Sequence, residues 1–118
     1  DIKLVDADNT SVDVGENLTI SANYSGATGF VLNGTTAQIV TSNSSTVPDM
    51  TINNTSGVTI NGDITVTSLT LNNGLLTMNT NDILTTEMIS GGFNNDNHII
   101  GLVKRKSNSI SDTTDKCY

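Results

Sequence analysis

The sequence of 118 residues contains one cysteine, one proline, one histidine and no tryptophan. A single cysteine excludes an internal disulfide framework and a zinc cluster built on cysteines. Basic residues are also few, since five Lys and Arg stand against twelve Asp and Glu and the net charge is -7. Five scattered cations cannot form the positive surface that phosphate neutralisation needs. The sequence therefore excludes nucleic acid as a partner.

Long apolar runs and aromatic side chains are also missing. A membrane-spanning helix needs roughly 18 consecutive apolar residues, and no stretch approaches that length, so we expect no membrane insertion. Two Phe and two Tyr leave only a narrow core filled by aliphatic side chains. Good helix formers are scarce, whereas Thr, Val and Ile, whose branched side chains fit pleated strands, are abundant. The composition predicts one all-β domain with almost no helix.

An internal repeat of about 19 residues organises the sequence. Short segments in which apolar residues alternate with Thr are separated by corners rich in Asn, Gly and Asp. At this spacing Ile52 matches Leu71, Ile60 matches Met78 and Ile64 matches Ile83. The period, with three short strands in each turn, predicts a parallel β-solenoid in which stacked coils bury one another's inner faces.

The alternation also predicts which residues form the core. Every second side chain of a strand points to the same face, so these segments are expected to build apolar columns along the solenoid axis. The expected inward residues are Ile52, Val58, Ile60, Ile64, Val66, Leu69, Leu71, Met78 and Ile83, and the Thr between them are expected to face water. The alternative is an immunoglobulin-like β-sandwich, because Asn-Gly hairpin turns would also explain the corners. A sandwich, however, has no reason to keep so regular a period.

The repeat sets the expected boundaries within a single domain, residues 1–118. We expect solenoid coils over 30–106, a less regular N-terminal part or cap over 1–29, and a polar tail over 107–118. Near the C-terminal end, Met88–Ser90 and His98–Val103 are expected to be the strands of a further coil.

Asn/Thr-rich strand and corner segments occupy residues 33–39, 50–54, 57–60 and 69–77. They are followed by an Ile-Ser-Gly-Gly stretch at 89–92 and a short strand with a basic end at 102–106. Together these segments resemble the Asn/Thr-rich β-solenoid segments of large secreted and surface proteins of Bacteroidota. The resemblance implies a solenoid fold and a secreted or cell-surface location. Such segments occur in adhesins, stalks and proteins of unknown role, so the resemblance implies no active site.

The sequence offers no catalytic set. A Ser-His-Asp site needs an oriented histidine and a nucleophile on a constrained turn, but His98 stands beside two Ile and no Gly-x-Ser-x-Gly motif is present. A glycosidase or lyase needs carboxylates in a groove, whereas the outward strand positions are Thr. We therefore expect no enzymatic activity, and we expect His98→Ala to leave every functional readout unchanged.

Acidic residues near the start are the candidates for a metal site. Asp6, Asp8 and Asp13 offer the hard oxygen ligands that calcium prefers. The glycine of an EF-hand loop is missing, which makes them weak calcium candidates. The sequence predicts no other cofactor.

The two ends of the expected solenoid carry opposite charges. Lys104, Arg105 and Lys106 follow the last clear strand, whereas Asp6 and Asp8 lie near the start. Solenoid ends expose unpaired N-H and C=O groups, and a head-to-tail contact that does not close yields a filament. These five residues are thus predicted to mediate self-association, with opposite charges steering the encounter.

The sequence therefore predicts a non-enzymatic extracellular structural protein that associates end to end with copies of itself, as a surface-layer, filament or stalk subunit. The alternative is an adhesive or carbohydrate-binding module of a larger surface protein, with cell-surface glycans as its partner. An enzyme fragment is the third hypothesis, although the sequence lacks the carboxylate set that it would need.

Overall fold

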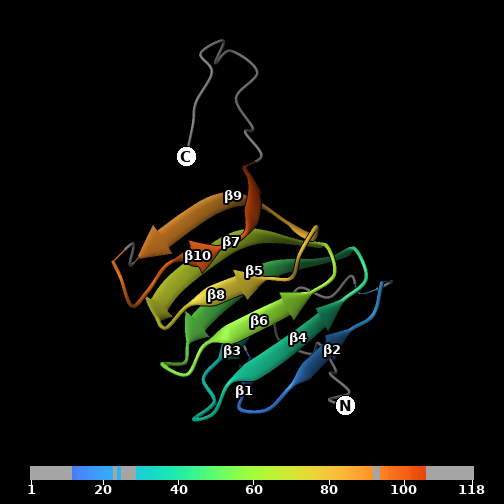
Figure 1. Ribbon diagram of the computed structural model, residues 1–118. Coiled ribbons are helices and arrows are strands. Elements are labelled where there is room, and N and C mark those ends of the chain that lie inside the picture. The colour runs from blue at the N-terminus through green and yellow to red at the C-terminus, as the bar shows by residue number, and fades with distance from the viewer. Residues whose placement is uncertain (1–11, 23, 25–28, 92–93, 106–118) are drawn as a thin grey trace.

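The computed structural model describes residues 12–22, 24, 29–91 and 94–105. Within them the chain winds repeatedly between two sheets and forms no helix (Figure 1). The strands are β1 (Val12–Val14), β2 (Leu18–Ile20), β3 (Phe30–Leu32), β4 (Gln38–Ser42), β5 (Ser45–Asn53), β6 (Val58–Asn61), β7 (Ile64–Asn73), β8 (Leu76–Met78), β9 (Ile83–Gly91), β10 (Ile99–Ile100) and β11 (Leu102–Arg105).

The odd-numbered strands form one sheet, in the order β1-β3-β5-β7-β9-β11, and the even-numbered strands form the other, in the order β10-β8-β6-β4-β2. We call them sheet one and sheet two. All strand pairs in both sheets are parallel. The fold is therefore a parallel β-solenoid of about four turns, as predicted. The sandwich alternative is wrong, because a sandwich is built from antiparallel strands.

The register confirms the predicted repeat in the middle of the chain. Ile52 pairs with Leu71, and Ile60 pairs with Met78, which are two of the matches that the repeat suggested. The long strands β7 and β9 each span two of the expected short strands, since β7 contains both Ile64–Val66 and Leu69–Leu71. The strand β5 extends the expected segment Met50–Ile52 back to Ser45.

The prediction that Ile83 points inward is wrong. Ile64 pairs with Leu84, which is fully buried, whereas Ile83 is 38% exposed. The reason is the corner before β9, because the chain from Met78 to Leu84 is longer than the chain between their partners, Ile60 and Ile64. Because of the additional corner residues, Leu84 rather than Ile83 lies on the inner face.

The core is a set of columns that run from coil to coil, as expected for a solenoid. One column passes from Val12 through Phe30, Met50 and Leu69 to Ile89. The other eight expected inward residues are all buried. Among the described residues, the buried apolar side chains are Val14, Leu18, Ile20, Phe30, Leu32, Val40, Val47, Met50, Ile52, Val58, Ile60, Ile64, Val66, Leu69, Leu71, Leu76, Met78 and Leu84.

The Thr that alternate with the core residues are less exposed than predicted. Thr51, Thr59, Thr65, Thr70 and Thr77 point outward but are half-buried. Side chains of neighbouring coils lie about 4.8 Å away on either side in a parallel sheet, and they shield one another. The outer face is a ribbed layer of hydroxyl and methyl groups rather than a fully hydrated one.

The end of the chain folds differently from the expected single strand His98–Val103. Gly101, with φ of +129°, forms a corner that separates β10 in sheet two from β11 in sheet one. At the start, β1 and β2 already continue the two sheets, within the segment 1–29 that we expected to be less regular. The expected tail 107–118 lies outside the described residues.

Candidate functional site

The two ends of the solenoid are the candidate site for self-association. Sheet one ends in β1 and β11, and sheet two ends in β2 and β10. Outer strands of a sheet carry N-H and C=O groups that can pair with another chain. We call β1, β2 and the corner Gly15–Asn17 the N-terminal end. We call β10, β11 and residues 88–91 of β9 the C-terminal end.

The C-terminal end exposes apolar side chains. Val103 continues an inner column above Leu84 but remains 40% exposed. Ile89 and Ile99 also point to the core and are only half-buried. Most of the large exposed hydrophobic side chains of the described residues lie at this end, namely Met88, Ile100, Leu102 and Val103. The core is thus incompletely covered where the coils stop.

The core of the N-terminal end is better covered. Val14, Leu18 and Ile20 are all buried although they belong to the first described coil. Tyr24, which follows β2, packs against the core, with its ring centroid 5.7 Å from that of Phe30. The two ends therefore differ in the apolar surface that they present.

Charge also distinguishes the ends. Lys104 and Arg105 lie on β11 and are exposed, and the Nε-H of Arg105 donates to the carbonyl oxygen of Glu87 at 3.2 Å. Asp13 on β1 and Glu16 in the adjoining corner are exposed at the opposite end. The other predicted self-association residues, Asp6, Asp8 and Lys106, lie outside the described residues.

Buried side-chain amides at the corner between sheet one and sheet two were missed by the sequence analysis. Gln38, Asn54 and Asn97 are buried there, and each donates to backbone carbonyls of the preceding coil. Gln38 donates to the carbonyl oxygens of Val14 and Glu16, both at 2.7 Å. Asn54 donates to that of Thr36 at 2.7 Å. Asn97 donates to those of Leu71 and Asn72, both at 3.0 Å. These bonds tie successive corners together.

The opposite corner is tied by two carboxylates. Asp82 accepts from the backbone N-H of Gly62 at 2.7 Å, and Asp63 accepts from that of Ile83 at 2.8 Å. Each carboxylate therefore accepts a hydrogen bond from the coil of the other one. Repulsion between the two like charges alone would favour both side chains pointing into water.

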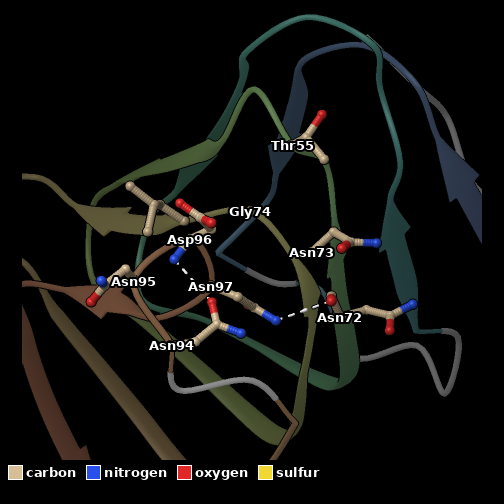
Figure 2. A pocket seen from close by; sticks show the side chains of 9 residues that line it. Thr55, Asn72, Asn73, Gly74, Asn94, Asn95, Asp96 and Asn97 are labelled. Atoms are coloured by element: carbon tan, nitrogen blue, oxygen red, sulfur yellow. Dashed lines mark hydrogen bonds between the residues drawn. The ribbon is translucent and has the colours of Figure 1, made fainter.

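A pocket of about 520 Å³ lies on the same side as the buried amides (Figure 2). It forms because the corner Gly74–Leu75 between β7 and β8 is short, whereas the corner 54–57 below it and the described corner residues 94–98 above it form longer turns. The short corner is recessed between longer ones. The lining residues are Thr55, Asn72, Asn73, Gly74, Leu75, Asn94, Asn95, Asp96 and Asn97.

Backbone and side-chain bonds shape the upper wall of this pocket. Asn94 and Asn97 form an antiparallel bridge, and the Oδ1 atom of Asn94 accepts from the N-H of Asp96 at 2.9 Å. The Nδ1 atom of His98 lies 2.8 Å from the carbonyl oxygen of Asn94. The histidine that the sequence analysis weighed as a catalytic residue is therefore part of this corner.

The calcium candidates are not brought together by the described part of the chain. Asp13 lies on β1, and Asp6 and Asp8 fall outside the described residues. Among residues 12–22, 24, 29–91 and 94–105, no group of three or more His, Cys, Asp or Glu side chains is placed to hold a metal ion. The same residues contain no helix that is long and apolar enough to cross a membrane.

Comparison with protein families, with curated proteins and with solved structures gave no match to this chain. The resemblance to surface-protein solenoids of Bacteroidota stays a prediction.

Proposed function

We propose that this protein is a non-enzymatic structural protein of the cell exterior that associates end to end with copies of itself. The observation that carries the proposal is the C-terminal end, where inner columns of the core stop at half-exposed apolar side chains. A second copy extends these columns and gives the outer strands new parallel partners.

Charge and symmetry favour a head-to-tail contact over a closed pair. Two C-terminal ends facing each other would bring Lys104 and Arg105 against the same cations of the other copy. The N-terminal end instead presents Asp13 and Glu16, so opposite charges steer the encounter. A head-to-tail contact leaves a free end on each copy and therefore builds a filament.

Val103→Asp tests this proposal. We expect the wild-type protein to form longer species as its concentration rises, and the variant to associate at least about tenfold more weakly, because docking would bury an unpaired carboxylate. The monomer should stay folded, since Val103 is 40% exposed. Sedimentation velocity and electron microscopy measure both outcomes.

Ile39→Asp is the matched control, because Ile39 is 42% exposed but lies on the side of the solenoid rather than at its C-terminal end. Association should be unchanged in this variant. A strictly monomeric wild-type protein at high concentration and low salt would overturn the proposal, as would a species that stops at two copies.

A second candidate function, binding of neutral cell-surface glycans, is favoured by the pocket. Its lining is rich in side-chain amides and includes one carboxylate, Asp96, and such groups hydrogen-bond sugar hydroxyls. The double variant Asn72→Ala/Asn95→Ala should then lose binding on a glycan array. Asn79→Ala, an exposed corner asparagine outside the pocket, should keep it. Equal glycan signals for all three proteins would exclude the pocket.

A further inference from the structure

The last buried amide of the corner has an oxygen without a partner. Asn97 is 6% exposed, its Nδ2 donates to two carbonyl oxygens, and its Oδ1 is buried with no hydrogen bond. The two bonds made by the amide nitrogen fix the orientation of the side chain. A buried acceptor without a donor is costly and marks a place where a partner is missing.

The earlier amides of the same corner show how such oxygens are satisfied. The Oε1 atom of Gln38 accepts from the N-H of Gly34 at 2.8 Å and from the side chain of Asn54, which belongs to the next coil, at 3.0 Å. The Oδ1 atom of Asn54 accepts from the N-H of Ser56 at 2.8 Å. One donor comes from the next coil, and the others come from the turn itself.

Asn97 cannot use a donor from its own turn in the manner of Asn54. Ser56 lies two residues after Asn54 and still belongs to the turn, because β6 begins only at Val58. The second residue after Asn97 is Ile99, which is already the first residue of β10. No donor of its own turn reaches the Oδ1 atom of Asn97. The remaining source is the next coil, which also supplies one of the two donors to Gln38.

The described chain contains only one strand of the next coil, β11. β11 covers residues 83–86 of β9, and no described residue pairs with Ile89–Gly91 on that side. In sheet two, β10 is the outer strand at this end. The missing parts are a short strand over Ile89–Gly91, a corner over Asn97 and a strand beside β10.

The N-terminal end has these parts in the right order and register. β1 starts the same column that ends at Ile89, through Val12 and Phe30. A second column, in sheet two, passes through Ile39, Thr59, Thr77 and Ile100. It begins at Asn17, because the Oδ1 atom of Asn17 accepts from the N-H of Ile39 at 2.9 Å. These two columns can therefore continue from one copy into the next.

We propose that β11 of one copy and β1, Gly15–Asn17 and β2 of a second copy together form one composite coil, in which an N-H of the Gly15–Asn17 corner donates to the Oδ1 atom of Asn97. Val12 of the second copy then follows Ile89, and its Asn17 follows Ile100. This inference rests on the proposed end-to-end association and specifies its register. Gly15, Glu16 and Asn17 are exposed, and so are Asn94, Asn95 and Asp96 around the acceptor, so both corners are accessible to a second copy.

Disulfide trapping tests the register. One protein carries Asn17→Cys and the other Ile100→Cys, both with Cys117→Ser, and the two are mixed under mild oxidation. Stacked residues of neighbouring strands lie about 4.8 Å apart, within disulfide range, whereas residues two coils apart lie about 9.6 Å apart and cannot be joined. We expect the pair at 17 and 100 to cross-link at least about tenfold more than the control pair of Asn17→Cys with Thr77→Cys.

Asn97→Ala tests the acceptor separately. We expect it to raise the dissociation constant roughly 3- to 10-fold, the worth of one hydrogen bond. Asn73→Ala, an exposed corner asparagine one coil earlier, should leave the dissociation constant within about twofold. Equal constants for both variants would overturn the role of Asn97.

The outcomes separate this inference from the proposed function. Association without cross-linking at 17 and 100 would overturn the composite coil and leave end-to-end association standing, whereas no association would overturn both. A separate Ile100→Cys protein that keeps its native Cys117 tests a third outcome. If this protein forms an intramolecular disulfide between positions 100 and 117 when dilute, the chain's own C-terminal segment occupies the site, and the composite coil is overturned.

Discussion

Ile60→Asp is expected to prevent folding. Ile60 is fully buried in a column with Val40 and Met78, one coil away on either side. The substitution removes an apolar side chain, which costs about 2–5 kcal/mol when the side chain shrinks to Ala, and adds a carboxylate without a partner, which costs several kcal/mol more. The sum is comparable to the whole stability of a small domain, about 5–15 kcal/mol. Far-UV circular dichroism with thermal melting measures the loss.

Thr59→Asp is the control for this prediction. Thr59 is the preceding residue in β6, points outward between Ile39 and Thr77, and is half-buried. The carboxylate reaches water there, so we expect a loss of no more than about 1 kcal/mol. A cooperative transition of Ile60→Asp that resembles that of Thr59→Asp would contradict the columnar core.

The repeat was sufficient to predict the fold because a solenoid is specified locally. Each coil repeats the same alternation, and the match between Ile52 and Leu71 gives both the period and the neighbouring strand. Parallel pairing then follows, because equivalent segments of successive coils run in the same direction. The one-dimensional pattern therefore contains most of the tertiary structure.

Corner lengths limited the prediction of the core. The period varies within a single coil, since Ile60 pairs with Met78 while Ile64 pairs with Leu84, so a constant repeat assigns the wrong residue wherever a corner gains or loses residues. Ile83 shows this. Its neighbour Leu84 is equally apolar, and periodicity alone cannot choose between two adjacent apolar residues at a corner of unknown length.

The buried corner amides were missed for a different reason. Asn is common at every corner of this sequence and is ordinarily a turn residue, so Asn54 and Asn97 looked like the exposed Asn73. Gln38 carried the one usable signal, since it lies two residues before the buried Val40 and therefore points inward. A polar residue at an inward position has to be hydrogen-bonded, and a corner carbonyl of a neighbouring coil is the nearest acceptor.

The ends of the solenoid are the part of the fold that supports the proposed function. Each coil is stabilised by the coils on either side, so the last coil always lacks one neighbour. In this chain the deficit is concentrated at the C-terminal end, where Ile89, Ile99 and Val103 are partly uncovered and Asn97 lacks a donor. Apolar surface and an unmatched polar atom in one place favour an interface over a simple chain end.

The corner at Gly74 gives the second large effect, because Gly74→Ala is expected to destabilise the fold by more than about 3 kcal/mol. Gly74 has φ of +88°, and a Cβ atom there would overlap the backbone carbonyl of Asn54 in the coil below. The N-H of Asn54 donates to the carbonyl oxygen of Asn73 at 3.0 Å, so the two corners are held close and cannot separate without losing ladder bonds.

Gly57→Ala separates this steric effect from backbone strain. Gly57 has a similar φ of +94°, but a Cβ atom there would meet only the carbonyl oxygen of Leu75, at an ordinary contact distance of 3.6 Å. It should therefore cost only the penalty of a left-handed alanine, about 1–2 kcal/mol, partly offset by the lower entropy of the unfolded chain. Urea unfolding of both variants measures the difference. If Gly74→Ala lost no more stability than Gly57→Ala, the close stacking of the short corner, and with it the origin of the pocket, would be wrong.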